Sequence, residues 1–445
     1  MASFEEKLAR AGVRVPEVHL PASGSDWEAW AVVACDQYSS EREYWEGVRE
    51  RVGGKPSTLN LIFPECYLED ADKDERILRI QSAMRDYLDR GVLSGAGEGF
   101  ILVERRTPFE PEPRKGLVIA VDLEKYEYGK GSASLIRPTE GTIVERLPPR
   151  MKIRRGAPLE LPHIMLLIDD PDRTVIEPLY AARETLKPLY DFELMTGSGH
   201  VRGWQVRGGE ALGRIADALT RLADPEAYKR KYGKDGVLLF AVGDGNHSLA
   251  TAKATWEEIK QANAGKPGVD SHPARWALVE LVNIYDEGLP FHPIHRVLFQ
   301  ADEKAFLEEL ARLGDCAIEE TSRSAAYAAV DEGAAEHRFA ILTAGGARLV
   351  RFPRPKANLA AGTIQEFLDG YLARHPETGI DYIHGRESLE TLAAKPGSLG
   401  IYLPPIDKAG FFGTVIRDGV MPRKTFSMGE APEKRFYIEA RKILP

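Results

Sequence analysis

The chain has 445 residues, a length that predicts two or three domains, or one elaborate domain, rather than one ordinary core. Hydrophobic residues make up 43% of the sequence and charged residues 29%, which is typical of a globular protein in water. The formal net charge of −9 argues against a general nucleic-acid binder, because such proteins neutralise phosphates with a basic surface. A local basic pocket for a small phosphate compound remains compatible with this charge.

The cysteines and the apolar runs of the sequence indicate the cellular compartment of the protein. Cys35, Cys66 and Cys316 are widely spaced and fit neither a disulfide framework nor a zinc motif, which predicts a reducing compartment. The N-terminus lacks the apolar core of a signal peptide, and no apolar run has the length needed to cross a bilayer. We therefore expect a cytoplasmic protein without a membrane partner.

The hydrophobic periodicity predicts interleaved helices and strands. Helices are expected over residues 4–11, 41–52, 74–91, 175–186, 208–222, 249–256 and 363–373 and from residue 434 onward, and strands over 27–34, 100–106, 114–123, 163–168, 237–242 and 276–285. Because the two types alternate irregularly, the sequence predicts an α+β fold with a mixed sheet. We expect a core over 1–300, a small α+β insertion over 301–360, and a C-terminal segment, 361–445, that returns to the core.

One short turn concentrates residues that bind anions. The turn over residues 243–248 (GDGNHS) joins the predicted strand 237–242 to a predicted helix. Glycines allow a close backbone approach, and free N–H groups at a helix N-terminus favour phosphate. Asp244 is suited to a divalent metal or to general-base catalysis, and His247 to moving a proton. The alternative interpretation is an ordinary capped helix with no ligand.

The spacing within this turn excludes two common phosphate-binding motifs. The Walker spacing is absent, and Ser248 stands where a dinucleotide motif has its third glycine. The predicted phosphate-binding residues of the turn are Gly243, Gly245, Asn246 and Ser248.

Three more clusters indicate anion binding. Arg137 lies in SLIRPTE beside a proline, which aims the guanidinium, and Glu140, at the end of the same stretch, is a candidate substrate-binding residue. His295 and Arg296 lie in FHPIHR, where Pro293 breaks the helix that a zinc site of the HExxH type requires. Basic residues also gather in MPRKTFSMGE, and the predicted ligand-binding residues there are Arg423, Lys424 and Ser427.

A fourth cluster, CDQYSS, lies where an early strand leads into a helix. Asp36, Gln37 and Tyr38 are candidate substrate-binding residues because polar side chains at a strand end commonly meet a ligand. Cys35 has no activating base next to it, which argues against a catalytic thiol.

These motifs together resemble a large family of unknown function, domain of unknown function 1015. The resemblance rests on the turn GDGNHSLATAK, on VACDQYSSEREYW, SLIRPTEGTIVER and HPIHR, and on MPRKTFSMGEAPEKRFYIEARKI. It covers roughly residues 20–445 of the chain. That family in turn looks like a distant relative of the ParB and sulfiredoxin group, which includes partition proteins that bind cytidine triphosphate, sulfiredoxin and free-serine kinases.

The resemblance implies a ParB/sulfiredoxin-like strand–turn–helix core that binds nucleotide phosphate. Ser248 departs from the group's pattern, which has an arginine there, so the charge would have to come from Arg137, Arg296 or Arg423. The turn has no cysteine, which argues against sulfiredoxin chemistry.

The sequence therefore predicts a phosphotransfer enzyme for a small phosphorylated metabolite or nucleotide. Mg²⁺ bound by Asp244 and a nucleotide (ATP, ADP or CTP) are the expected cofactors, and kinase and phosphatase are not distinguished. The resemblance to serine kinases suggests serine or phosphoserine as the substrate. The alternatives are a non-catalytic nucleotide- or phosphate-binding regulatory module, and a scaffold whose site has decayed; a homo-oligomer is compatible with all three.

Overall fold

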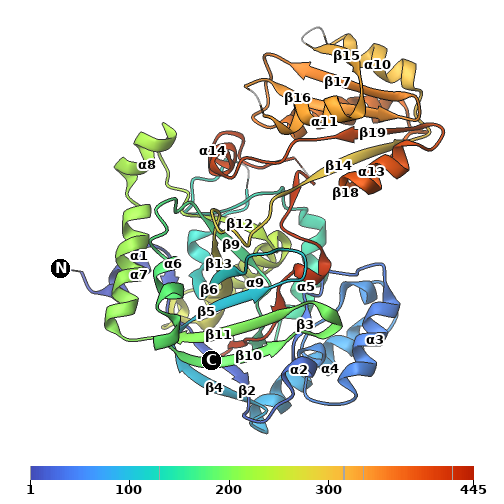
Figure 1. The fold of residues 1–445 in the computed structure, drawn as a ribbon. Helices are drawn as coiled ribbons and strands as arrows, with labels where there is room; N and C mark the ends of the chain where they lie inside the picture. Colours follow the sequence, from blue (N-terminus) through green and yellow to red (C-terminus); the bar gives the residue numbers. More distant parts are fainter. Residues whose placement is uncertain (1, 130, 314–315, 334, 423) are drawn as a thin grey trace. The chain divides into compact units, whose positions relative to one another are not determined.

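The chain folds into two compact units, which are described separately (Figure 1). The first unit contains Met1–Leu289 and Gly429–Pro445, and the second contains Pro290–Met428. The computed structural model describes residues 2–129, 131–313, 316–333, 335–422 and 424–445. Among these residues, no helix is both long enough and apolar enough to cross a membrane.

The first unit is built around a mixed sheet. Its strands have the order β10-β11-β5-β6-β13-β9-β12-β7, with β1 paired to β6. Pairing is parallel between β12 and β7 and between β13 and β9, and antiparallel elsewhere. The strands are β1 (Val13–Arg14), β5 (Phe100–Arg106), β6 (Arg114–Asp122), β7 (Ile136–Pro138), β9 (Met165–Ile168), β10 (Lys187–Glu193), β11 (His200–Val206), β12 (Phe240–Asp244) and β13 (Trp276–Asn283).

Helices and small two-stranded ladders complete this unit. The helices are α1 (Phe4–Arg10), α2 (Trp27–Trp30), α3 (Arg42–Val52), α4 (Lys73–Asp89), α5 (Leu147–Arg154), α6 (Glu177–Ala181), α7 (Gly209–Leu222), α8 (Pro225–Tyr232) and α9 (Asn246–Ala262). The ladders pair β2 (Glu17–Pro21) with β4 (Leu93–Glu98), β3 (Val32–Val33) with β21 (Phe436–Tyr437), and β8 (Leu159–Glu160) with β22 (Arg441–Lys442). The prediction of an α+β fold with a mixed sheet is confirmed.

The second unit has an antiparallel sheet with helices on both faces. Its strand order is β15-β17-β16-β19-β14-β18, with β20 paired to β14. The strands are β14 (His292–Phe299), β15 (Ala317–Thr321), β16 (His337–Thr343), β17 (Gly346–Phe352), β18 (Gly379–His384), β19 (Ser398–Tyr402) and β20 (Phe426–Ser427). The helices are α10 (Glu303–Ala311), α11 (Arg323–Asp331), α12 (Ala360–Arg374), α13 (Arg386–Ala393) and α14 (Lys408–Asp418).

The alternation of side chains along β16 explains this two-faced packing. Phe339 and Ile341 belong to a core that includes residues of α10 and α12, whereas Ala340 and Leu342 belong to a second core with residues of α11 and α13. Successive side chains of a strand point to opposite faces, so a strand covered on both faces is apolar throughout.

The second unit is larger than the insertion expected from the sequence. The sequence placed the insertion at 301–360, whereas the unit runs from Pro290 to Met428. The difference arises because β14, β18 and β19 hydrogen-bond into the same sheet as β16 and β17. Pairing between strands far apart in sequence is not visible in local periodicity.

Two local predictions were wrong. Residues 27–34 were expected to form one strand, but Trp27–Trp30 is helical because Asp26 caps the helix by accepting a hydrogen bond from Ala29 N at 3.1 Å. The segment from Lys434 onward was expected to be a helix, but it contains the short strands β21 and β22. Figure 1 shows this C-terminal segment, in red, among the strands of the first unit.

A buried ion pair holds the C-terminal segment in the first unit. Arg435 donates to Glu280 on β13 and, at 2.6 Å, to Glu439 Oε2. The three side chains are almost completely buried. Burial opposes the charge of the guanidinium, but the carboxylates of Glu439 and Glu280 raise the pKa of Arg435 above its usual value.

We expect Arg435→Met to lower the free energy of unfolding of the first unit by about 3–5 kcal/mol, because it leaves a buried carboxylate without its cation. All six tryptophans belong to this unit, so guanidinium unfolding followed by tryptophan fluorescence measures the loss. The control is Lys55→Met, which removes an exposed pair with Asp26 and should cost less than about 1 kcal/mol. Equal losses in the two variants would contradict a special role of the buried pair.

Candidate functional site

The turn between β12 and α9 depends on Gly245. Its φ is 76°, and a Cβ atom there would lie 3.1 Å from both Cα and Cγ1 of Ile164. Glycine is the residue that adopts this backbone conformation without strain and that leaves this space free. Among the described residues, no hydrogen bond uses the backbone N–H groups of Asn246, His247 and Ser248, which open α9. These groups form the positive end of the helix, where anions are favoured.

The segment after β7 is fixed to this turn by hydrogen bonds. Thr139 N donates to Asn246 Oδ1 at 3.2 Å, and the Thr139 hydroxyl donates to the Val242 carbonyl at 2.6 Å. Ile143 N donates to His247 Nε2 at 3.3 Å. The side chains of Asn246 and His247 therefore hold the neighbouring loop in place, while their backbone N–H groups remain available.

The surroundings of His247 keep its imidazole neutral. Burial lowers the pKa of His247, and the nearby cations Arg150 and Arg146 lower it further. A neutral ring is consistent with the hydrogen bond that Nε2 accepts from Ile143. The same two arginines add positive charge beside the N-terminus of α9.

Ser248 belongs to a chain of polar side chains. Tyr437 Oη lies 2.8 Å from His163 Nδ1, and His163 Nε2 lies 2.8 Å from Ser248 Oγ. Burial raises the pKa of the Tyr437 phenol, and Cys35 N donates to Tyr437 Oη at 3.2 Å. We assign the tautomer in which the phenol donates to Nδ1 and Nε2 carries the ring proton and donates to Ser248. In this tautomer the serine hydroxyl keeps its own proton for another acceptor.

Asp244 is paired with a lysine from the C-terminal segment. Its Oδ2 lies 3.1 Å from Lys434 Nζ, and its Oδ1 accepts from Gly245 N at 2.9 Å. Burial raises the pKa of Asp244, but Lys434, His163 and the Gly245 N–H together lower it, and the pKa is lowered overall. A carboxylate held in its charged form by an ammonium group is a weak general base.

Asp36 is a second carboxylate at this site. Its Oδ2 lies 3.9 Å from His163 Nε2, its side chain is 30% exposed, and its Oδ1 accepts from Gln37 Nε2 at 3.0 Å. Tyr38 has a φ of 51° and stacks on Tyr44 at a centroid separation of 3.7 Å. His163 thus lies between the turn and Asp36, and Gln37 is hydrogen-bonded to Asp36.

A cavity of about 150 Å³ adjoins these groups. Ser248, Thr251, His163 and Tyr437 contribute polar atoms to its wall, together with Cys35. Burial raises the pKa of the Cys35 thiol, which agrees with the expectation that it is not a catalytic nucleophile. The rest of the wall combines apolar residues with the charged residues Glu65, Arg150, Arg154 and Glu160; the apolar ones include Leu61, Ile62, Phe63, Met84, Ile153 and Leu161.

Arg137 lies in β7 and pairs with Ala241 of β12, the strand that leads into the turn, but the guanidinium of Arg137 has other partners. Arg137 is 7% exposed, and it donates to the carbonyls of Ser134 at 2.9 Å and Gly236 at 2.6 Å. It therefore connects two loops of the first unit. Glu140 follows directly after Thr139 and is half-buried.

The remaining predicted residues belong to the second unit. Arg296 is fully buried, with its guanidinium 5.3 Å from the Tyr382 ring, and burial lowers its pKa to about 10. Ser427 is buried in β20, Lys424 is exposed, and Arg423 lies outside the described residues.

His295 is part of the core of the second unit. Its Nδ1 accepts a hydrogen bond from Leu403 N at 3.1 Å, and its ring stacks on Tyr402 at 4.5 Å. Burial, together with the positive charge of Arg296, lowers the pKa of His295 to about 3. The imidazole is therefore neutral at physiological pH and has a structural hydrogen-bond partner.

The site contains residues that the sequence did not single out. They come from three separate stretches, and only the fold brings these to the turn: Arg146 and Arg150 from one, His163 from the second, and Lys434 and Tyr437 from the third. The described residues include no group of three or more histidine, cysteine, aspartate or glutamate side chains arranged to hold a metal ion.

The protein has an α+β fold in which a strand–turn–helix leaves three backbone N–H groups without a hydrogen bond among the described residues. Residues 17–371 match the family model described as a protein of unknown function (DUF1015), and the chain belongs to this family. No protein with a curated description matches the sequence.

Several solved structures are similar over most of the chain. A conserved hypothetical protein from Pyrococcus furiosus has 13% identity and a TM-score of 0.36, with 74% of this chain and 95% of that chain covered. A free serine kinase mutant in complex with ADP has 12% identity and a TM-score of 0.37, with 74% and 92% covered. SbnI with a C-terminal truncation, from Staphylococcus aureus, has 9% identity and a TM-score of 0.34, with 72% and 82% covered.

The stability of the second unit should depend on pH through His295. Its pKa is about 3 in the folded chain and near 6.5 when unfolded, so the unfolded chain binds more protons between these values. The contribution of neutral His295 to the free energy of unfolding is complete above pH 6.5. It is lost as the pH falls, by up to about 1.4 kcal/mol per pH unit. Hydrogen exchange of β14 and β19 peptides between pH 4.5 and 6.5 measures this slope.

His295→Asn is the matched control, because the amide oxygen can still accept from Leu403 N but does not titrate. The slope attributable to His295 should disappear in this variant. An unchanged slope would show that other groups cause the pH dependence.

Proposed function

We propose that this protein is a phosphotransfer enzyme that acts on a small metabolite. The proposal rests on one arrangement: the unused N–H groups at the start of α9 lie beside the Ser248 hydroxyl, whose proton is left available by the chain from Tyr437 through His163. Several donors at a helix N-terminus suit phosphoryl oxygens.

The cations around the turn support phosphate as the ligand. Lys434 lies at Asp244, and Arg146 and Arg150 lie close enough to lower the pKa of His247. We infer that these residues, rather than Arg137 or Arg296, provide the positive charge that Ser248 does not supply. Phosphoryl transfer depends mainly on positioning and on stabilisation of charge, which such a site would supply.

Asp36 is our candidate for the general base. In the forward reaction the substrate hydroxyl attacks the phosphorus of the donor, its proton passes to the Asp36 carboxylate, and the bond from phosphorus to the leaving oxygen breaks. Asp244 then has a different role, because Lys434 holds it as a weak base. We assign Asp244 to positioning Lys434 and to assisting a metal ion.

A magnesium ion would fit between protein carboxylates and phosphate oxygens. Asp36 lies beside His163, and the imidazole of His163 also contributes to the electrostatic environment of Asp244. Mg²⁺ is commonly held by one or two carboxylates together with substrate phosphates and water. The ion would neutralise charge on the phosphates, and a nucleotide such as ATP or ADP would be the phosphoryl donor or product.

The cavity favours a small acceptor. Its volume of about 150 Å³ is below the range of about 300–1,000 Å³ typical of sites for drug-sized ligands. Serine or phosphoserine, suggested by the sequence resemblance, is of suitable size. Whether the enzyme acts as a kinase or as a phosphatase depends on which phosphorylated compound occupies the turn.

The second candidate function is a non-catalytic phosphate- or nucleotide-binding module. The ion pair between Asp244 and Lys434 favours it, because the carboxylate nearest the turn is a weak base. Binding would then use the same N–H groups and cations, but no proton transfer would be needed.

We expect a phosphate compound to raise the melting temperature of the wild type, and Lys434→Met to reduce this shift, because the variant removes a cation from the turn. Ligand at 100 times its Kd stabilises the folded state by about 2.7 kcal/mol. Thermal shifts should be measured with inorganic phosphate, phosphoserine, ATP, ADP and CTP, with and without Mg²⁺.

Lys442→Met is the matched control, since Lys442 is exposed on β22 of the same segment. It should retain the shift. If no compound stabilises the wild type, the proposed phosphate site is incorrect.

Asp36→Asn distinguishes the two candidate functions. For an enzyme, the variant should retain the thermal shift with nucleotide but lose at least about 100-fold in turnover, the usual contribution of a general base. Turnover is measured as ADP release from ATP in the presence of serine, or as phosphate release from phosphoserine. Turnover in the variant equal to that of the wild type would contradict the role of Asp36, and binding without wild-type turnover would favour the module.

A further inference from the structure

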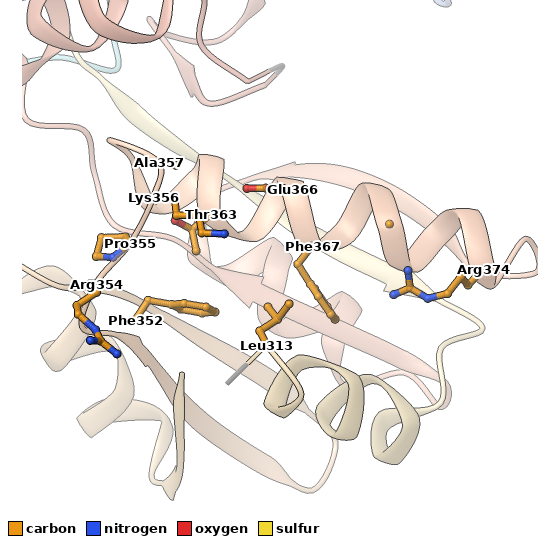
Figure 2. A pocket seen from close by; sticks show the side chains of 11 residues that line it. Leu313, Phe352, Arg354, Pro355, Lys356, Ala357, Thr363, Glu366, Phe367 and Arg374 are labelled. Carbon is orange, nitrogen blue, oxygen red and sulfur yellow. The ribbon is translucent and has the colours of Figure 1, made fainter. Parts of the chain in front are cut away.

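The second unit contains a cavity of its own, with a volume of about 300 Å³ (Figure 2). It lies along one side of α12, next to the loop that follows β17 and to Leu313, two residues after the end of α10. Figure 2 shows the side chains of Phe352, Leu313 and Phe367 pointing into the middle of this space. The centre of the cavity is therefore apolar.

The aromatic part of this wall is held firmly by the core. Phe352 is 6% exposed and stacks on Phe339, and Phe367 is 7% exposed and contacts Phe306 edge to face at 5.2 Å. Both rings are fixed by neighbours on the side away from the cavity. The apolar surface is thus preformed, which lowers the entropic cost of binding a ligand.

Cationic side chains surround this apolar centre. Arg354 and Arg374 lie at opposite ends of the cavity in Figure 2, and Lys356 projects near Thr363. Glu366 is the one acidic residue in the cavity wall, so the described lining carries an excess of positive charge. Arg354 and Lys356 lie at one end of the cavity, and Arg374, which is paired with Glu309 at 2.7 Å, lies at the other end.

Gly370 keeps part of the cavity open. Thr363, Phe367, Gly370 and Arg374 are spaced so that they share one face of α12, and all four line the cavity. A Cβ atom at Gly370 would meet only the Arg374 guanidinium, at 3.3 Å. Glycine inside a helix lowers the stability of that helix, so Gly370 does not stabilise α12. Its effect at this position is to leave room in the cavity.

We propose that this cavity binds a small amphipathic anion, with an apolar ring or short acyl chain between Phe352 and Phe367 and a carboxylate or phosphate group near Arg354 and Lys356. The volume is at the lower end of the range for small-molecule sites. A neutral apolar ligand would leave the cations unused, and a cationic one would be repelled. This site is independent of the phosphotransfer proposal, because all its residues belong to the second unit.

The probe for this site is 1-anilinonaphthalene-8-sulfonate, an aromatic sulfonate whose fluorescence rises in an apolar environment. We expect one saturable site per wild-type chain. Gly370→Leu should abolish it by filling the cavity, while the added side chain raises helix propensity and keeps the unit folded. Lys356→Glu should weaken binding by about tenfold through the reversal of charge.

Lys304→Glu is the matched control, because Lys304 is an exposed residue of α10 that does not line the cavity. Its affinity for the probe should equal that of the wild type, and circular dichroism should show that all variants are folded. The proposal fails if the wild type has no saturable site, if Gly370→Leu binds as the wild type does, or if Lys304→Glu weakens binding as much as Lys356→Glu.

Competition experiments identify the polar group of the ligand. Displacement of the probe by octanoate supports a carboxylate, and displacement by phenyl phosphate supports a phosphate. If octanol or phenol displaces the probe as well as these anions do, or if neither anion displaces it, an amphipathic anion is the wrong class of ligand.

Discussion

The buried guanidinium of Arg435 is the constraint on which the first unit depends. A cation without water requires carboxylates of its own, and Glu280 and Glu439 supply them. Room for Glu280 exists because Gly116, on the neighbouring strand β6, has no side chain: a Cβ atom at Gly116 would collide with the carboxylate of Glu280. Arg435 also donates to the Pro162 carbonyl at 3.0 Å, next to His163. One side chain thus fixes β13, the stretch before β9 and the C-terminal segment together.

The candidate site follows from this arrangement. Once Arg435 is fixed, its neighbour Lys434 reaches Asp244 at the turn, and Tyr437, two residues further on, reaches His163. The groups of the proposed site therefore come from stretches that are far apart in the sequence, and the C-terminal segment supplies two of them, Lys434 and Tyr437. The turn provides backbone N–H groups, the segment provides Lys434 and the Tyr437 hydroxyl, and Arg146 and Arg150 add further positive charge.

The sequence predicted the local part of this site and missed the long-range part. Gly245 and the start of α9 could be predicted from the sequence. A turn glycine and the beginning of a helix both produce signals within a few neighbouring residues. His163 and Lys434 gave no such signal, since their partners lie far along the chain. The segment from Lys434 was predicted to be helical because local propensity cannot show that its strands pair with β3 and β8. The α+β class was predictable because it depends only on the order of elements.

The location of charge explains why histidine and arginine in a sequence are ambiguous evidence for an anion site. His295 and Arg296 resemble a ligand-binding pair, yet burial lowers the pKa of both, and their polar atoms bind the surrounding chain. Lys434 is inconspicuous in sequence, but it lies beside the carboxylate of Asp244 at a helix N-terminus. A phosphate that approached the turn would compete with Asp244 for this ammonium group, whereas a magnesium ion bound to Asp244 would release it. Metal and phosphate would then bind more strongly together than either would alone, because each removes an unfavourable interaction for the other.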